Sequence, residues 1–217
     1  MRQEGKKNLR WNTMKVLAVG FLGVILIGAV LLWLPICNEK PISFLDALFT
    51  STTSVCVTGL ITIVPKYQFT IVGKVVLLLL IQIGGLGIVA CVAAFFMIMR
   101  RKITLKERIV IQETYNMDSL GGLVGMVRRI LLGTLVVEGA GAVLYAIQFV
   151  PDFGLLKGVW YGVFHSVSAF CNAGIDILGE DSLAKYVTNP LINITTMLLI
   201  TLGGIGFTVW YDVVDTG

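Results

Sequence analysis

The sequence is short of charge and nearly lacks histidine, and both shortages narrow its possible functions. Only 14% of its 217 residues are charged, 56% are hydrophobic, and the mean hydropathy is +0.88. A soluble domain of this size could not stay dissolved with that balance, so the sequence predicts a membrane protein. The single histidine argues against an imidazole zinc site. No catalytic group or phosphate-binding loop is recognisable, so we expect neither enzyme activity nor a tightly bound cofactor.

Cysteine and basic residues are also arranged in ways that exclude common functions. The four cysteines have no metal-binding spacing and predict no disulfide framework: Cys37, Cys56, Cys91 and Cys171. The net charge of +4 comes from basic residues at the edges of apolar runs, which argues against a nucleic-acid partner. The basic N-terminus leads into an apolar run without a small-residue cleavage site, and we expect it to remain as an anchor.

Long apolar segments are the most prominent feature that the sequence does have. Each is near or above the ~20 residues that cross ~30 Å of hydrocarbon. They run approximately over Val16–Ile36, Ile71–Met99, Val127–Val150 and Leu191–Val214. Two shorter stretches, Phe44–Cys56 and Trp160–Cys171, contain polar residues and are too short to span a bilayer. These two are typical of re-entrant helices, and the whole pattern predicts an all-α polytopic membrane protein.

The basic residues predict which ends of the spans face the cytoplasm, because loops rich in Lys and Arg stay there. Most of the 17 share one side if the chain starts inside: Arg2, Lys6, Lys7, Arg10, Lys15, Arg100, Arg101, Lys102, Lys106, Arg108, Arg128 and Arg129. Each unit then crosses outward, dips back and returns, so both units have the same orientation. Parallel units can surround a central pore. The predicted organisation is a cytoplasmic N-terminus (1–15), a first repeat (16–99), a cytoplasmic linker (100–126) and a second repeat (127–217).

The chain duplicates itself. A shift of 115 residues superposes "SVCVTGL", residues 54–60, on the stretch that contains "FCNAGI", residues 170–175. A shift of 119 lays "LIQIGGLGI", residues 80–88, over "LITLGGIGF", residues 199–207, with three glycines in register. Duplication of span, hairpin and span is expected to repeat one structural unit. Close helix packing is the expected role of these "GGxG" glycines, and a hinge is the alternative.

Each hairpin has features suited to holding a cation. Ser43, with Asp46 three residues later, is predicted to cap a short helix that starts at the outer face. The C-terminal carbonyls of such a helix point toward the bilayer centre and attract cations. Gly59 and Gly174 permit backbone angles that turn successive carbonyls toward one axis. Rings of such carbonyls replace the hydration shell of an ion in potassium filters.

These motifs, with the inner stretch "RRKITLKERIVIQE" (100–113), resemble the membrane subunit of bacterial Ktr-type potassium uptake systems in the Trk/Ktr/HKT superfamily. The resemblance covers essentially the whole chain. It implies four units around one pore, potassium uptake across the bacterial cell membrane, and a cytosolic nucleotide-binding regulatory ring as partner. It also assigns the filter strands: Cys56, Val57, Thr58 and Gly59, and Cys171, Asn172, Ala173 and Gly174.

Only two of those four units are present, so the chain is expected to supply half of a pathway. The other half would come from a longer reading frame or from a second copy of the chain. Glu138 lies within a span, where a carboxylate indicates either ion passage or pairing with another helix. The linker could contact lipid headgroups or dock the regulator. The alternative function is that of a non-conducting scaffold or regulatory fragment.

Overall fold

The structure is a computed structural model, and the residues it describes are 2–99, 109, 110, 112, 123–207, 209 and 210. Every regular element within these ranges is helical, as predicted. The main elements are α1 (Arg2–Trp33), η1 (Pro35–Cys37), α2 (Phe44–Val55), α3 (Pro65–Gln68), α4 (Ile71–Leu86), α5 (Ile88–Ile98), α7 (Leu123–Phe153), α8 (Leu155–Phe170), η2 (Ala184–Tyr186) and α9 (Pro190–Ile205). The predicted role of the linker falls largely outside the described residues.

Among the described residues, two unbroken helices are long and apolar enough to cross a membrane, over Lys15–Trp33 and Gly125–Phe153. The predicted span Ile71–Met99 consists of two helices, α4 and α5, which meet the same criterion only as a pair and are bent by 107° at Gly87. That glycine has a φ of +84°, which a continuous right-handed helix does not allow. Helix α9 is a shorter apolar helix, and it also ends at a glycine, Gly206, with a φ of +87°.

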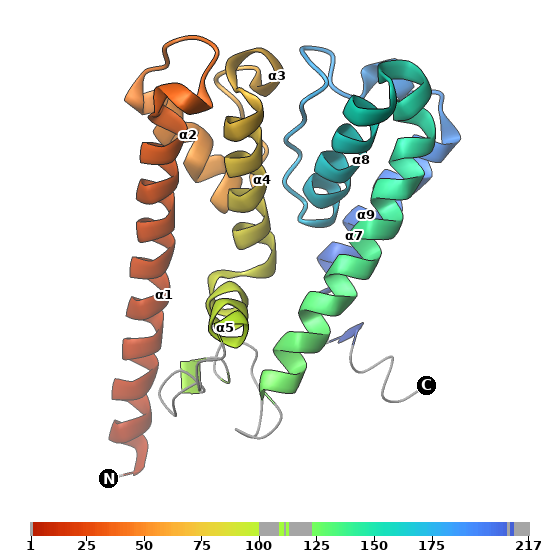
Figure 1. The fold of residues 1–217 in the computed structure, drawn as a ribbon. Helices are drawn as coiled ribbons and strands as arrows, with labels where there is room; N and C mark the ends of the chain where they lie inside the picture. The colour runs from red at the N-terminus through yellow and green to blue at the C-terminus, as the bar shows by residue number, and fades with distance from the viewer. Residues whose placement is uncertain (1, 100–108, 111, 113–122, 208, 211–217) are drawn as a thin grey trace.

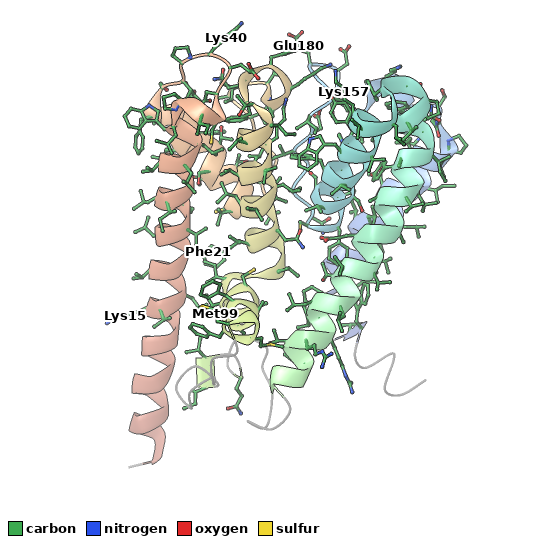
Figure 2. All side chains as sticks on the ribbon, in the orientation of Figure 1. Lys15, Phe21, Lys40, Met99, Lys157 and Glu180 are labelled. Atoms are coloured by element: carbon green, nitrogen blue, oxygen red, sulfur yellow. The ribbon has the colours of Figure 1, made fainter. Side chains whose placement is uncertain are left out.

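The helices form two groups side by side (Figure 1). One group contains α1, α2, α4 and α5, and the other contains α7, α8 and α9. The short helices α2 and α8 both lie in the same half of the molecule, away from the N-terminal end of α1. Lys40, Lys157 and Glu180 lie at the end of the molecule that is nearer to α2 and α8, and Lys15 lies toward the opposite end (Figure 2).

Local signals explain where the short helices begin. The Ser43 hydroxyl accepts a hydrogen bond from the Asp46 backbone N–H at 3.1 Å, which confirms the predicted cap of α2. Helix α8 begins at Leu155, before the predicted Trp160, because Gly154 turns the chain with a φ of +81°. Gly158 then brings α8 against α7, since a Cβ there would lie 2.5 Å from the Val150 Cα.

The same packing contact occurs in both groups. A Cβ at Gly28 of α1 would overlap the Ser51 hydroxyl and lie 2.7 Å from the Leu80 side chain. A Cβ at Gly141 of α7 would overlap the Ser166 hydroxyl and lie 2.7 Å from the Leu199 side chain. Glycine therefore lets each long helix approach its short helix and its inner helix closely.

The core runs through both groups, and the outward surface is apolar. One buried cluster includes Leu77 and Ile81 of α4 together with Phe149 and Phe164 of the second group. Large apolar side chains on the long helices face outward, as Val19, Leu135 and Val136 do. An apolar exterior of this kind suits a surface in contact with lipid.

Candidate functional site

The first predicted filter segment continues directly from the end of α2. Cys56 ends the helix, and Val57 then takes a left-handed conformation with a φ of +53°. The Thr58 N–H donates to the Thr53 carbonyl at 3.0 Å, and the two threonine hydroxyls lie 2.6 Å apart. Gly59 has a φ of +76°. The segment is thus a tight, hydrogen-bonded turn followed by extended chain, and not a helix.

The second segment repeats this conformation at the end of α8. Cys171 ends the helix, and Asn172 has a φ of +60°. The Ala173 N–H donates to the Ser168 carbonyl at 2.8 Å. Gly174 has a φ of +64°. Left-handed angles cost about 1–3 kcal/mol at residues with side chains, so their recurrence at Val57 and Asn172 indicates a tightly constrained backbone.

The two segments meet at their glycines. A Cβ added to Gly59 would lie 2.8 Å from the Ala173 carbonyl oxygen and 3.5 Å from the Gly174 Cα. The structure therefore brings together the ends of both predicted filter segments. Cys56, Thr58, Asn172 and Gly174 are exposed, whereas Cys171 and Ala173 are buried.

Backbone charge near these segments favours cations. Helices α2 and α8 end immediately before them, at Val55 and Phe170. A helix C-terminus carries a partial negative charge from its unpaired carbonyls. Within the described ranges, no cluster of three or more His, Cys, Asp or Glu side chains could hold a metal ion.

Side-chain hydroxyls hold the outer ends of the segments, a role that the sequence reasoning did not assign. The Leu60 N–H donates to the Thr53 hydroxyl oxygen at 3.0 Å. The Ser168 hydroxyl donates to the Ile175 carbonyl at 2.6 Å. Thr53 and Ser168 coincide under the 115-residue shift, so the duplication contained the signal that could have identified them.

The inner helices contact the ends of the short helices through glycine, as the "GGxG" motifs predict. A Cβ at Gly84 would overlap the Val55 carbonyl oxygen, and one at Gly203 would overlap the Phe170 carbonyl oxygen. A Cβ at Gly85 would overlap the Cys171 thiol, although Gly85 and Cys171 belong to different groups. The packing prediction is wrong for Gly87 and Gly206, which interrupt the helix as described above.

Glu138 contacts a helix of the other group. Its carboxylate is 7% exposed and accepts a hydrogen bond from the Gln82 amide at 3.1 Å. Its backbone carbonyl accepts a hydrogen bond from the Ser166 hydroxyl at 2.6 Å. Gln82 was not recognised from the sequence, because nothing local relates two residues 56 positions apart.

His165 is buried behind the second segment. Its Nδ1 lies 2.7 Å from the Tyr161 carbonyl oxygen, and its ring packs against Phe149 and Tyr145. Because Nδ1 faces a carbonyl, the neutral ring carries its proton there. The contacts assign His165 to packing around α8.

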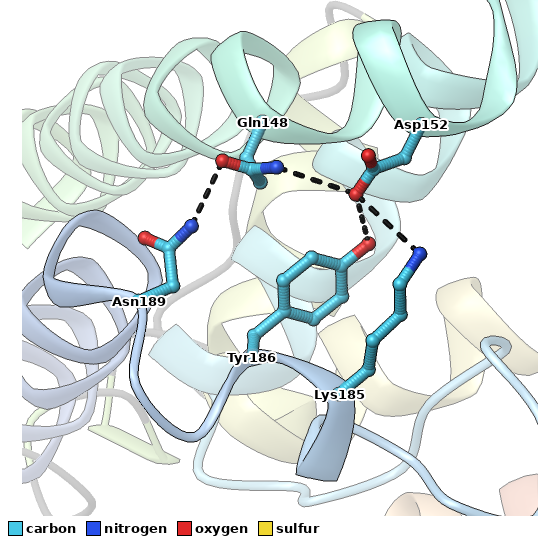
Figure 3. Close-up of polar contacts among 5 residues, drawn as sticks. All are labelled: Gln148, Asp152, Lys185, Tyr186 and Asn189. Atoms are coloured by element: carbon cyan, nitrogen blue, oxygen red, sulfur yellow. Dashed lines mark hydrogen bonds and ion pairs between the residues drawn. The ribbon is translucent and has the colours of Figure 1, made fainter.

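A polar network fixes the loop that follows the second segment (Figure 3). The Tyr186 hydroxyl donates to the Asp152 carboxylate at 2.6 Å, and the Lys185 ammonium lies 3.8 Å from the same oxygen. The Asn189 amide donates to Gln148 at 2.8 Å, while its side-chain oxygen caps α9. Burial, together with the hydrogen bond to Asp152, raises the pKa of Tyr186 above its ordinary value.

Comparisons with known proteins agree with a transport function. The family model described as TrkH, cation transport protein, matches residues 3–216. The Ktr system potassium uptake protein B of Bacillus subtilis is 44% identical over 207 residues, which cover 95% of this chain and 46% of the relative. The potassium/sodium uptake protein NtpJ of Enterococcus hirae is 39% identical over 217 residues, covering 99% and 48%. The Ktr system potassium uptake protein B of Vibrio alginolyticus is 37% identical over 199 residues, covering 92% and 44%.

This chain spans about half the length of these curated relatives. All three are named as uptake proteins, which agrees with the prediction that the chain is not an enzyme.

Proposed function

Because this chain belongs to the TrkH cation transport family, we propose that it forms half of a carbonyl-lined potassium pathway in the bacterial cell membrane. One observation carries the proposal. Two segments, each at the end of a short helix, share the same left-handed turn and meet at Gly59 and Gly174.

The chemistry follows from the backbone. Main-chain oxygens of residues 56–59 and 171–174 replace water around a dehydrated K⁺, and glycine allows neighbouring carbonyls to face one axis. The C-terminal ends of α2 and α8 add partial negative charge below the ion. Because only main-chain oxygens coordinate the ion, the filter needs no particular side chain. The cysteines at positions 56 and 171 are therefore compatible with this coordination.

Unequal burial supports the need for further units. Ile81 on α4 is 0% exposed because the second group covers it, whereas Ile200, its counterpart on α9, is 43% exposed. Cys171 is buried against α4, whereas its counterpart Cys56 is exposed. On α4 this face is covered by the second group of helices, whereas the equivalent face of α9 is exposed. The face of the first hairpin that contains Cys56 is exposed in the same way. We propose that two more units of the same kind, from a longer chain or a second copy, cover these faces.

The proposed orientation places the N-terminus in the cytoplasm, since most basic residues flank the ends of the spans on that side. The names of two relatives refer to a Ktr system, which supports a partner component. We propose a cytosolic nucleotide-binding ring in that role, with 100–126 as its docking segment. We propose that the rest of the surface of the chain contacts the lipid bilayer and that the chain binds no nucleic acid.

Potassium-limited growth tests the proposal. A complete four-hairpin assembly that contains this chain is expressed in a bacterium lacking its own potassium uptake, and rubidium uptake is measured beside growth. Rescue with saturable rubidium uptake is expected. An assembly that reaches the membrane in normal amount but neither rescues growth nor moves rubidium would instead establish the non-conducting scaffold.

A further inference from the structure

The loop that follows the second filter segment, residues 175–179, is a hydrogen-bonded turn, which we call the outer loop. The Asp176 carboxylate accepts hydrogen bonds from the backbone N–H groups of Leu178 and Gly179, at 2.8 and 3.4 Å. Leu178 is buried. Because this turn is closed by a side chain and follows Gly174 directly, a shift of Leu178 is passed on to the filter segment.

A lysine of the first group binds the outer loop. Lys66 lies on α3, between α2 and α4, and its ammonium donates a hydrogen bond to the Leu178 carbonyl oxygen at 2.6 Å. Among the described residues, this carbonyl is the one hydrogen-bond acceptor of the ammonium, and no carboxylate forms an ion pair with it. Hydrogen bonds from a charged donor are shorter and stronger than those between neutral groups.

Lys66 is itself restrained within the first group. Its backbone carbonyl accepts a hydrogen bond from the Lys74 ammonium of α4 at 3.0 Å. Its own ammonium lies 5.3 Å from the centre of the Tyr67 ring, where cation–π attraction acts. Gly179 makes room for the lysine, since a Cβ there would lie 3.3 Å from the Lys66 Cδ. The bond to Leu178 therefore joins two parts of the chain that are each held in place.

The second filter segment thus contacts the first group at three levels. At its start, a Cβ on Gly85 would overlap the Cys171 thiol. In its middle, a Cβ on Gly59 would lie 2.8 Å from the Ala173 carbonyl oxygen. Beyond its outer end, Lys66 binds the outer loop. Close packing at the first two levels resists approach of the two groups, whereas the charged hydrogen bond at the third resists their separation.

The duplication offers a comparison for this contact. Under the 119-residue shift, Lys66 and Tyr67 coincide with Lys185 and Tyr186. The Lys185 side chain is 64% exposed, and its ammonium lies 3.8 Å from the Asp152 carboxylate of its own group. Such an exposed pair contributes little to stability. The same Lys-Tyr sequence therefore makes different contacts in the two repeats, and the neighbouring group decides the contact of Lys66.

We propose that Lys66 is a positioning residue for ion selection. Its ammonium fixes the outer end of the second filter segment against the first group and so maintains the spacing of the filter carbonyls. This inference rests on the proposed function and adds to it a residue, outside both filter segments, that determines specificity. Without this bond the outer loop can move away from the first group, and carbonyls that are held less closely discriminate less between ions of different size.

Substitution of Lys66 tests the proposal in the complete four-hairpin assembly. Lys66→Met keeps nearly the length of the side chain but removes its charge and its donor hydrogens. The preference for rubidium over sodium uptake is expected to fall about threefold to tenfold, because a hydrogen bond to a charged group is comparable with a factor of about ten in an equilibrium. Lys66→Arg keeps a charged donor and should restore the preference to within about twofold.

Lys157→Met is the matched control. Lys157 is exposed at the same end of the molecule, and no described contact joins it to the outer loop (Figure 2). Loss of a positive charge near a cation pathway changes the KM for both ions alike, whereas loss of positioning changes their ratio. The ratio should therefore stay the same in Lys157→Met. An unchanged ratio in Lys66→Met, an equal fall in Lys157→Met, or an equal fall in Lys66→Arg would overturn the proposal.

A second measurement does not depend on transport. Hydrogen–deuterium exchange of the same assemblies follows the N–H groups of Leu178 and Gly179, which bond to Asp176. Their exchange should become about tenfold faster in Lys66→Met, and only in the outer loop, because a lost bond favours local opening. Equal exchange in Lys66→Met and the wild type, or an equal increase throughout the chain, would overturn the proposal. A wild-type assembly that carries no rubidium refutes the proposed function instead, so the two failures are distinguishable.

Discussion

Replacing Gly59 by serine should damage ion selection more than the same change at two other glycines. A side chain at the φ of +76° costs about 1–2 kcal/mol, because left-handed backbone crowds the Cβ against the following carbonyl. The new Cβ would also lie 2.8 Å from the Ala173 carbonyl oxygen, so that oxygen must move. Under the proposed function this oxygen is a potassium ligand.

The matched variants are Gly174→Ser and Gly139→Ser. Gly174 has a φ of +64°, but the nearest atom to an added Cβ is the Gly59 Cα at 3.7 Å, so only backbone strain is expected. Gly139 is exposed on α7, and of the described atoms none lies within 4 Å of an added Cβ. Serine there should improve the helix by about 0.5 kcal/mol.

The assay compares rubidium and sodium uptake by the complete assembly, normalised to the protein in the membrane. We expect the preference for rubidium to fall about tenfold or more in Gly59→Ser, by less in Gly174→Ser, and not at all in Gly139→Ser, since 1.4 kcal/mol is a factor of ten. Equal changes at all three positions would show that the contact with Ala173 has no bearing on selectivity.

Three further substitutions test how the segments are held. Tyr186→Phe removes the hydrogen bond to Asp152 and should lower the thermal unfolding midpoint, followed by circular dichroism, by about 2–4 °C. Because the pKa of Tyr186 is raised in the folded state, this stabilisation is present at neutral pH and is lost as the pH rises past ~10. An unchanged midpoint would show that this hydrogen bond does not stabilise the loop. Gly203→Ala pushes a methyl group into the Phe170 carbonyl and should cost about 1–3 kcal/mol in urea unfolding. Gly139→Ala is the control and should stabilise the helix by about 0.5–1 kcal/mol. Similar values for both variants would contradict the packing. Ser43→Ala removes the cap of α2 and should cost about 1 kcal/mol in the same titration, which a value near zero would refute.

Local features of the sequence were sufficient to predict the cap of α2 and the two glycines that follow the short helices. Ser43 caps α2 as predicted because an N-cap depends on neighbouring residues alone. Gly59 and Gly174 were identifiable because few residues other than glycine take left-handed angles without strain. The use of these segments as a filter stays a prediction.

Features that depend on distant parts of the chain were not predictable in the same way. A hinge at Gly87 was considered only as the alternative to close packing, because apolar composition is the same in a straight and a broken helix. The Gln82 partner of Glu138 is fixed by the contact between the two groups of helices, which no periodicity records. The turn at Gly154 that starts α8 at Leu155 was not recognised either.

The elbow at Gly87 has a mechanical consequence. A rotation of one end of a straight helix turns the whole helix. The axes of α4 and α5 are bent by 107°, so a rotation of α5 need not turn α4. Movement of α5 can therefore pivot at one glycine without dragging α4, which is wedged against Val55 through Gly84. A change in the angle of α5 would therefore leave the contact between Gly84 and Val55 unchanged.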